Sequence, residues 1–307
     1  YAGFLEGSQK LAQAYLEGAL ASLGWQPELG QTLDTQQVAS ELGIQAHKRQ
    51  ALRQLFKSFV ASGHLVQEEN MLCIAQHVRP RSADELSSIK SRLLSRFPWA
   101  KYELALMANC GEVLGQVLIG ELNPLDLLFS QSGICAADFY RRSAVANYFN
   151  LLVCDALREL IRSKNGKPLR IIEIGAGTGG TTSAVLPILP RDGTQYVFTD
   201  KSPVFFDAAE CEFSDYPFVE YRVLDIEKTT SAQGWIPEQF DIVIASNVLH
   251  ATRDIQQTLR NVRELLTKEG TLLLVELLRP QAWLDFTFGL LEGWWRFDDR
   301  IRLDYPL

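Results

Sequence analysis

The chain has 307 residues, a formal net charge of −7 and 47% hydrophobic residues, which is typical of a water-soluble globular protein. This acidic balance, without any run of lysine and arginine, argues against a protein that wraps nucleic acid. No apolar segment approaches the roughly 18 residues needed to span a membrane, and the five cysteines show no CxxC spacing, so we expect a cytoplasmic protein with free thiols.

The first 80 residues are predicted to form helices followed by a small strand pair. Residues 35–44 and 48–59 have helical periodicity, and residues 64–73 have the pattern of a hairpin. This order is winged-helix-like. A DNA-reading helix would need basic residues, and the candidate helix has four of them: Lys48, Arg49, Arg53 and Lys57. The acidic net charge of the chain nevertheless favours a lid that packs on protein.

Helical patterns continue over residues 82–132, with a break at Asn123-Pro124, and over 136–163, which holds Tyr140, Asn147 and Asn150. A turn-rich link follows at residues 164–168. We therefore predict a mainly helical N-terminal lid domain at 1–165 and a second domain at 166–307.

From Arg170 onward, strand and helix patterns alternate. Strands are predicted at 171–174, 196–199, 218–224, 240–245 and 271–276, and helices at 181–189, 205–211 and 255–266. This rhythm predicts an α/β fold, a Rossmann-like doubly wound parallel sheet that binds its ligand at the carboxyl ends of the strands. Polar residues gather at those ends: Glu173, Asp200, Asp225, Asn247, His250 and Glu276.

The first strand runs into a glycine-rich loop with Gly175, Gly177 and Gly179. Glycines let the backbone turn tightly and approach a ligand, and the following helix start offers unpaired N–H groups. Asp200 ends the second strand, where a carboxylate accepts hydrogen bonds from ribose hydroxyls; its alternative role is a helix cap. Asp225 is placed to meet an adenine amino group or to be a loop carboxylate. The spacing predicts an adenosine-containing cofactor but leaves a nicotinamide dinucleotide and S-adenosylmethionine open.

Several strings together resemble one family. They are EIGAGTGG at 173–180, FTD at 198–200, LDIE at 224–227, ASNVLHAT at 245–252 and GLLEGWWRF at 289–297. Residues 111–125 and 139–143 are similar to that family's lid region. Over about residues 85–307 the chain resembles the C-methyltransferase domain of polyketide synthases, a class I S-adenosylmethionine-dependent methyltransferase.

The resemblance implies S-adenosyl-L-methionine as cofactor and S-adenosyl-L-homocysteine as product. The substrate it implies is a β-ketoacyl chain on the phosphopantetheine of an acyl carrier protein, with other polyketide synthase domains as neighbours. The implied cofactor-binding residues are Glu173, Gly175, Gly177, Gly179, Asp200, Asp225, Ile226 and Asn247. Glu173 has the alternative of bracing the glycine turn, and Asn247 that of capping its strand.

Methylation at the α-carbon of a β-ketoacyl thioester requires a general base, for which histidine is suited near neutral pH. His250 follows the fourth strand and Glu276 ends the adjacent fifth, so the two side chains can meet and the carboxylate can fix the imidazole tautomer. They match the His–Glu dyad of the family. Its lid tyrosine matches Tyr140, although Tyr148 is predicted on the same helix. Without this context a lone histidine after a strand is more often structural.

Other classes remain in competition. These are an O- or N-directed methyltransferase, a non-catalytic domain that keeps the fold, and a nicotinamide oxidoreductase. The last is disfavoured because this chain has no Tyr-x-x-x-Lys pattern after the predicted sheet. We predict no metal site, because the other histidines (His47, His64 and His77) lie in the N-terminal part; the Asp298-Asp299 pair is the remaining acidic cluster.

Three expectations concern the outer parts of the chain. Class I methyltransferases usually close the sheet with an antiparallel hairpin, but only about 30 residues follow Glu276, and the chain begins at Tyr1, so we expect a piece with an incomplete C-terminal end. The aromatic residues between 283 and 297 either wall the acyl pocket or pack as a helix. An acidic carrier protein would favour a basic patch, for which Arg141, Arg142 and Lys164 are candidates.

Overall fold

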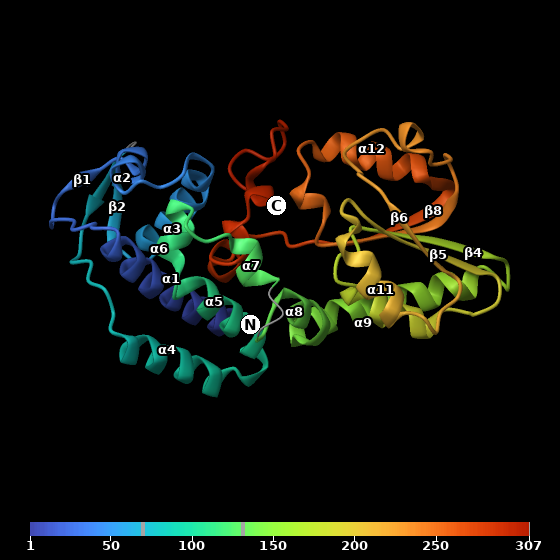
Figure 1. The fold of residues 1–307 in the computed structure, drawn as a ribbon, viewed down its shortest axis with the longest axis horizontal. Coiled ribbons are helices and arrows are strands. Elements are labelled where there is room, and N and C mark those ends of the chain that lie inside the picture. The colour runs from blue at the N-terminus through green and yellow to red at the C-terminus, as the bar shows by residue number, and fades with distance from the viewer. Residues whose placement is uncertain (69–70, 130–132, 307) are drawn as a thin grey trace. The chain divides into compact units, whose positions relative to one another are not determined.

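The computed structural model describes residues 1–68, 71–129 and 133–306. Two compact units make up the chain (Figure 1): one combines residues 1–136 with 279–295, and the other combines 137–278 with 296–307. The division therefore differs from the predicted boundary at 165, because residues 137–165 pack with the sheet and 279–295 with the N-terminal helices. The tip of the predicted hairpin at 69–70 and residues 130–132 lie outside the described residues.

The first unit, the helical unit, contains the predicted order of helix, helix and hairpin. A two-residue strand that the sequence did not reveal extends the hairpin to a three-stranded sheet in the order β1-β3-β2, since two residues carry no periodic signal. The strands are β1 Thr32–Leu33, β2 Leu65–Glu68 and β3 Met71–Ile74. The helices are α1 Ala2–Ser22, α2 Thr35–Glu41, α3 Arg49–Ala61, α4 Ala83–Arg96, α5 Lys101–Gly111, α6 Leu114–Ile119, α7 Pro124–Leu128 and α13 Ala282–Asp285.

The aromatic stretch after the sheet belongs largely to the core of the helical unit. Trp283 and Phe286, on and next to α13, are fully buried, and the Phe286 ring lies 5.7 Å from that of Tyr15 on α1. Phe288 and Trp294 are buried in the same unit. This packing favours the alternative of a helix that fills a core over that of an acyl-pocket wall.

The second unit, the sheet unit, has five parallel strands in the order β6-β5-β4-β7-β8. This is a Rossmann-like doubly wound parallel sheet, as predicted. The strands are β4 Leu169–Ile174, β5 Thr194–Asp200, β6 Val219–Val223, β7 Phe240–Ser246 and β8 Leu266–Val275. Helices α10 Gly180–Val185, α11 Phe206–Glu212 and α12 Ile255–Leu265 connect them. No further strand follows β8 among the described residues.

Both faces of this sheet are covered, which explains its nearly continuous apolar strands. Ile171 packs on one side with Leu157 of α9 (Ala144–Ser163), and α10 and α11 lie on that side too. The next residue, Ile172, points to the opposite side, where Val262 of α12 covers it. Figure 1 shows α12 on one face of the sheet and α9 and α11 on the other. Alternation along the strand thus assigns side chains to two separate cores.

The long helix predicted over 136–163 is interrupted at Ser143. This residue is extended (φ −67°, ψ 147°), and its hydroxyl accepts a hydrogen bond of 3.0 Å from the N–H of Ala146. Such an N-cap starts a new helix, so the segment forms α8 Ala136–Arg142 and α9. Tyr140 and Tyr148 therefore lie on different helices, and Tyr148 is 59% exposed.

In the part of the chain that the structure describes, no helix is long and apolar enough to cross a membrane.

Glu103 on α5 gives a test of the helical unit. Its side chain is fully buried, neither carboxyl oxygen has a hydrogen-bond partner in another residue, and burial raises its pKa to about 7. Since the folded state holds the proton more tightly than the unfolded state, this residue costs stability as pH rises from about 4.5 to 7, and the full cost persists above that.

We therefore expect Glu103→Gln to raise the free energy of unfolding, relative to wild type, by about 1–3 kcal/mol more at pH 8 than at pH 4.5. Urea unfolding at both pH values measures this. Glu112→Gln, an exposed neighbour, serves as the control. An equal effect of Glu103→Gln at both pH values would contradict the raised pKa.

Candidate active site

The glycine loop that follows β4 needs its glycines. Gly175, Gly177 and Gly179 have φ values of 62°, 54° and 74°, in the left-handed region that other residues rarely adopt. A Cβ atom on Gly175 would lie 2.2 Å from Cγ2 of Val248, which follows β7. The loop therefore packs directly on the turn that carries His250.

Glu173 braces this loop from the core side. Its Oε2 accepts hydrogen bonds of 2.5 Å from the hydroxyls of Thr182 on α10 and Tyr196 on β5. Burial raises the pKa of Glu173 to about 7, and the two hydroxyl donors only partly offset that effect. Because this side chain is almost fully buried, the geometry favours bracing over a direct contact with a cofactor.

Asp200, at the end of β5, fastens the loop from the other side. One carboxyl oxygen accepts the N–H of Gly177 at 3.1 Å, and the other accepts that of Ser202 at 2.9 Å. Burial raises the pKa of Asp200, and the backbone hydrogen bonds, which lower it, offset this effect only in part. Since the residue stays partly exposed, a contact with ribose hydroxyls is compatible with this arrangement and remains a prediction.

Asp225 and Ile226 follow β6. Burial raises the pKa of Asp225, but the ammonium groups of Lys201 and Lys228, at 3.3 and 3.4 Å, help to bring it below its usual value. The carboxylate therefore stays ionised. The Ile226 side chain is buried in the α12-side core, and its carbonyl accepts from Asn261 at 2.7 Å. Their predicted adenine-binding roles are not tested by these contacts.

Asn247, directly after β7, has a φ of 52°, which asparagine tolerates better than most residues. Its N–H donates to the carbonyl of Val275 at 2.7 Å. The chain therefore turns sharply here while remaining tied to β8, and the next residues are directed toward Glu276. Its predicted cofactor contact is not tested by this geometry.

The structure brings His250 and Glu276 together. Nδ1 of His250 lies 2.7 Å from Oε2 of Glu276, and both side chains are 11% exposed. Oε1 of Glu276 accepts the N–H groups of Val248 at 3.0 Å, Leu249 at 2.7 Å and His250 at 3.3 Å. A neutral imidazole that donates its Nδ1 proton to this carboxylate keeps Nε2 as its basic nitrogen.

Tyr140 reaches the same region from α8. A Cβ atom on Gly180 would lie 2.9 Å from Cβ and 3.0 Å from the carbonyl oxygen of Tyr140, so α8 packs closely on the start of α10. Burial raises the pKa of the Tyr140 phenol, and the Glu276 charge raises it further. The hydroxyl therefore keeps its proton at neutral pH. On α9, Asn150 accepts the hydroxyl proton of Thr181 at 3.1 Å and holds the other side of this helix start.

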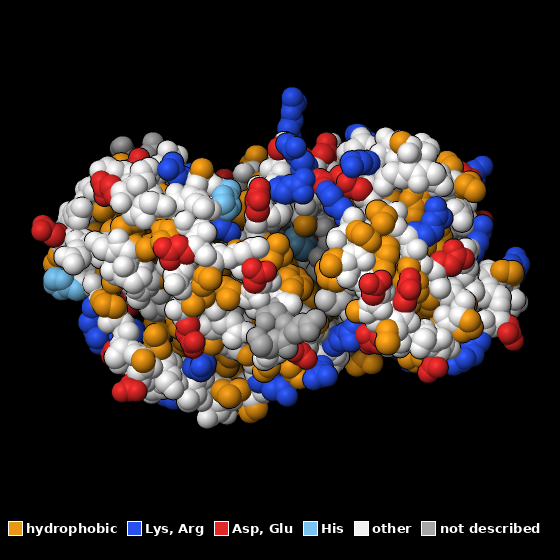
Figure 2. Space-filling model, viewed as in Figure 1, with side chains coloured by type: hydrophobic (Ala, Val, Ile, Leu, Met, Phe, Trp, Pro, Cys, Tyr) orange, Lys and Arg blue, Asp and Glu red, His pale blue; other side chains and the backbone are white. Residues whose placement is uncertain are grey.

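The three basic residues expected to meet a carrier protein are all paired within the sheet unit. Arg141 donates to the carbonyl of Thr178 in the glycine loop and pairs with Glu212 at 2.5 Å. The other two pairs are Arg142 with Asp138 at 3.3 Å and Lys164 with Asp241 at 2.8 Å. On the face shown in Figure 2, basic and acidic side chains are interspersed over this unit. Each of these three residues thus has an acidic neighbour, and Arg141 also fixes the loop. Their contact with a carrier protein stays a prediction.

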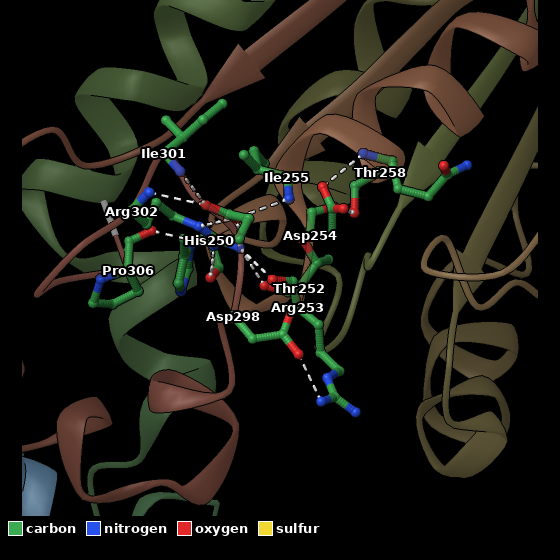
Figure 3. A network of polar contacts seen from close by, with 12 residues as sticks. His250, Thr252, Arg253, Asp254, Ile255, Thr258, Asp298, Ile301, Arg302 and Pro306 are labelled. Carbon is green, nitrogen blue, oxygen red and sulfur yellow. Dashed lines mark hydrogen bonds and ion pairs between the residues drawn. The ribbon is translucent and has the colours of Figure 1, made fainter.

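Asp298 and Asp299 each form an ion pair with an arginine. Asp298 pairs with Arg253 at 2.7 Å (Figure 3). Asp299 pairs with Arg302 at 2.6 Å. Over residues 1–68, 71–129 and 133–306, no group of three or more His, Cys, Asp or Glu residues could hold a metal ion.

Comparison with known proteins identifies the family of this chain. A family model described as a methyltransferase domain matches residues 172–272. Non-reducing polyketide synthase mapC from Penicillium roqueforti is 34% identical over 97% of this chain and 12% of its own length. The crystal structure of the CurJ carbon methyltransferase is 35% identical with a TM-score of 0.93, covering 100% of this chain and 81% of that one. The chain belongs to the C-methyltransferase domains of polyketide synthases.

Two further structures fit this C-methyltransferase assignment. The CMeT domain of the citrinin polyketide synthase is 28% identical with a TM-score of 0.87, over 99% of this chain and 79% of that one. The trans-methyltransferase CalH, solved in complex with SAH, is 28% identical with a TM-score of 0.71, over 94% of this chain and 76% of that one. The chain spans about one eighth of the length of curated relatives such as mapC.

Gly175→Ala tests whether the close contact of the loop with Val248 shapes the cofactor site of this methyltransferase. The added methyl group meets Val248 and the left-handed backbone is strained, so we expect at least a tenfold weaker affinity for S-adenosylmethionine and a stability loss of about 1–3 kcal/mol. Isothermal titration calorimetry and urea unfolding measure the two effects. Gly18→Ala on α1, where a Cβ meets nothing within 4 Å, is the control; an unchanged affinity in Gly175→Ala would refute the expectation.

Proposed function

We propose that this domain transfers a methyl group from S-adenosylmethionine to the α-carbon of a β-ketoacyl thioester held on an acyl carrier protein. The observation that carries the proposal is the His250–Glu276 pair, 2.7 Å apart, on a turn that packs against the glycine loop through Val248. Membership in the C-methyltransferase domains of polyketide synthases supports the substrate class.

The residues at the carboxyl ends of the strands suit S-adenosylmethionine. When bound, this cofactor supplies an electrophilic methyl group. The left-handed glycines at 175, 177 and 179 leave their backbone uncovered by side chains, and Asp200 keeps a partly exposed carboxylate beside them. The SAH bound in the structurally similar CalH is the demethylated form of the same cofactor and supports the assignment.

His250 acts as the general base. Its Nε2 accepts the α-proton of the substrate, and the electron pair of the broken C–H bond is delocalised in the resulting enolate. Glu276 keeps the Nδ1 proton in place, and its negative charge stabilises the imidazolium that forms. The α-proton is therefore taken up by a residue whose imidazole ring and backbone N–H are both held by the Glu276 carboxylate.

Tyr140 complements the base. Because its pKa is raised, its hydroxyl remains a hydrogen-bond donor for the substrate carbonyl, where negative charge develops as the proton leaves. A donor aimed at a developing oxyanion lowers the barrier to enolate formation.

A methyltransferase directed to oxygen or nitrogen could use a similar base, and a non-catalytic domain would use none. The position of the new methyl group separates these alternatives. The carrier protein as partner rests on the relatives being polyketide synthases. Arg141, Arg142 and Lys164, each with an acidic neighbour, stay candidates for its contacts.

The proposal predicts that wild type adds one methyl mass to a carrier-bound β-ketoacyl chain in the presence of S-adenosylmethionine. His250→Ala is expected to lower the rate by about 10²- to 10⁴-fold, because the α-proton loses its acceptor. Mass spectrometry of the intact carrier protein measures the gain, and fragmentation locates the methyl group. His47→Ala, an exposed histidine of the helical unit, is the matched control. Methylation on oxygen, or full activity in His250→Ala, would contradict the proposal.

A further inference from the structure

We infer that Arg302, fixed by Asp299, is a positioning residue that holds the backbone of the His250 turn in its reactive place. The inference rests on the proposed function, since it concerns the geometry of the general base. Arg302 lies on the C-terminal segment 296–307, which packs within the sheet unit.

The guanidinium of Arg302 donates to the backbone carbonyls of His250, Thr252 and Arg253 (Figure 3). Nη1 donates to the carbonyl oxygen of His250 at 2.8 Å. Nη2 donates to those of Thr252 at 2.6 Å and Arg253 at 3.1 Å. A further contact of 3.4 Å reaches the carbonyl of Pro306. One side chain therefore satisfies carbonyl groups on both sides of residue 251.

Asp299 keeps this guanidinium in position. Its Oδ2 lies 2.8 Å from Nε and 2.6 Å from Nη2 of Arg302, and both side chains are about 5% exposed or less. The same carboxylate accepts the N–H of Ile255 at 3.0 Å at the start of α12, and those of Ile301 and Arg302 at 3.0 and 2.9 Å. These donors outweigh burial and hold the pKa of Asp299 far below its usual range, so the pair stays ionised.

The turn at Leu249–Ala251 is thereby held from two sides. Glu276 accepts N–H groups of residues 248–250, and Arg302 donates to the carbonyl of His250. An anion on the amide side and a cation on the carbonyl side match the direction of the peptide dipoles. Neither contact alone fixes both the position and the rotation of the peptide groups around His250, whereas the two together do.

Arginine is required for this arrangement. Its planar fork carries five N–H donors, and here they serve one carboxylate and several carbonyls at once. A lysine would keep the charge beside Asp299 but has one nitrogen, which cannot reach all of these oxygens. A buried ion pair is weak evidence for stability, so its directed contacts to the turn are the more specific consequence.

The deciding experiment compares Arg302→Met and Arg302→Lys with Arg300→Met, an exposed arginine of the same segment. We expect kcat for methyl transfer to fall about 10- to 100-fold in Arg302→Met and less in Arg302→Lys, with KM for the acyl carrier substrate and the affinity for S-adenosylmethionine within about twofold of wild type. Hydrogen exchange of the amides at 248–253, followed by mass spectrometry, is expected to be at least about tenfold faster in Arg302→Met. Arg300→Met should match wild type in every measurement.

Unchanged kcat and unchanged amide exchange in Arg302→Met would overturn the inference. If Arg302→Met does not fold by circular dichroism, Arg302→Lys decides, and wild-type kcat and exchange in that variant would overturn it equally. His250→Ala is measured in parallel. Activity in His250→Ala would refute the proposed function, whereas a loss there with wild-type behaviour in the Arg302 variants would refute only the positioning role.

Discussion

The carboxylate of Glu276 is the group on which the rest of the site depends. One oxygen accepts three consecutive backbone N–H groups after β7, and the other faces Nδ1 of His250 at 2.7 Å. Such charge-assisted hydrogen bonds are stronger than neutral ones, and together they offset the cost of burying the anion. Because one carboxylate shapes the turn and orients the imidazole, loss of Glu276 would disturb both the backbone geometry and the ring orientation of His250.

Much of this arrangement could be predicted from the sequence. Apolar runs separated by helical patterns specify a parallel sheet, and parallel strands place their carboxyl ends at one edge. Since β7 and β8 are neighbours, a histidine after one and a glutamate after the other had to lie close together. The glycines after β4 could also be predicted, because a tight turn that a ligand approaches favours residues without a Cβ atom. The contact of Gly175 with Val248 could not, because it depends on how two loops pack.

Other features depend on contacts that leave no periodic signal. The cap at Ser143 divides a helix whose apolar pattern continues across it, and residues 279–295 leave the sheet unit for the helical core. Glu173, Asp200 and Asp225 share a position at strand ends, but their carboxylates have different partners: hydroxyls, loop amides and lysines. The pairing of Arg302 with Asp299 lies in an irregular segment, where spacing alone does not show which carbonyls a guanidinium meets.

The most direct test of this account is the tautomer of His250, observed by ¹⁵N NMR of histidine-labelled protein in wild type and in Glu276→Gln. The account predicts that neutral His250 in wild type carries its proton on Nδ1 and has an unprotonated Nε2, and that Glu276→Gln shifts this population toward the other tautomer. A wild-type imidazole protonated on Nε2 with Nδ1 unprotonated would contradict the account, because the nitrogen facing Glu276 would then be an acceptor and the outer nitrogen could not take up the α-proton.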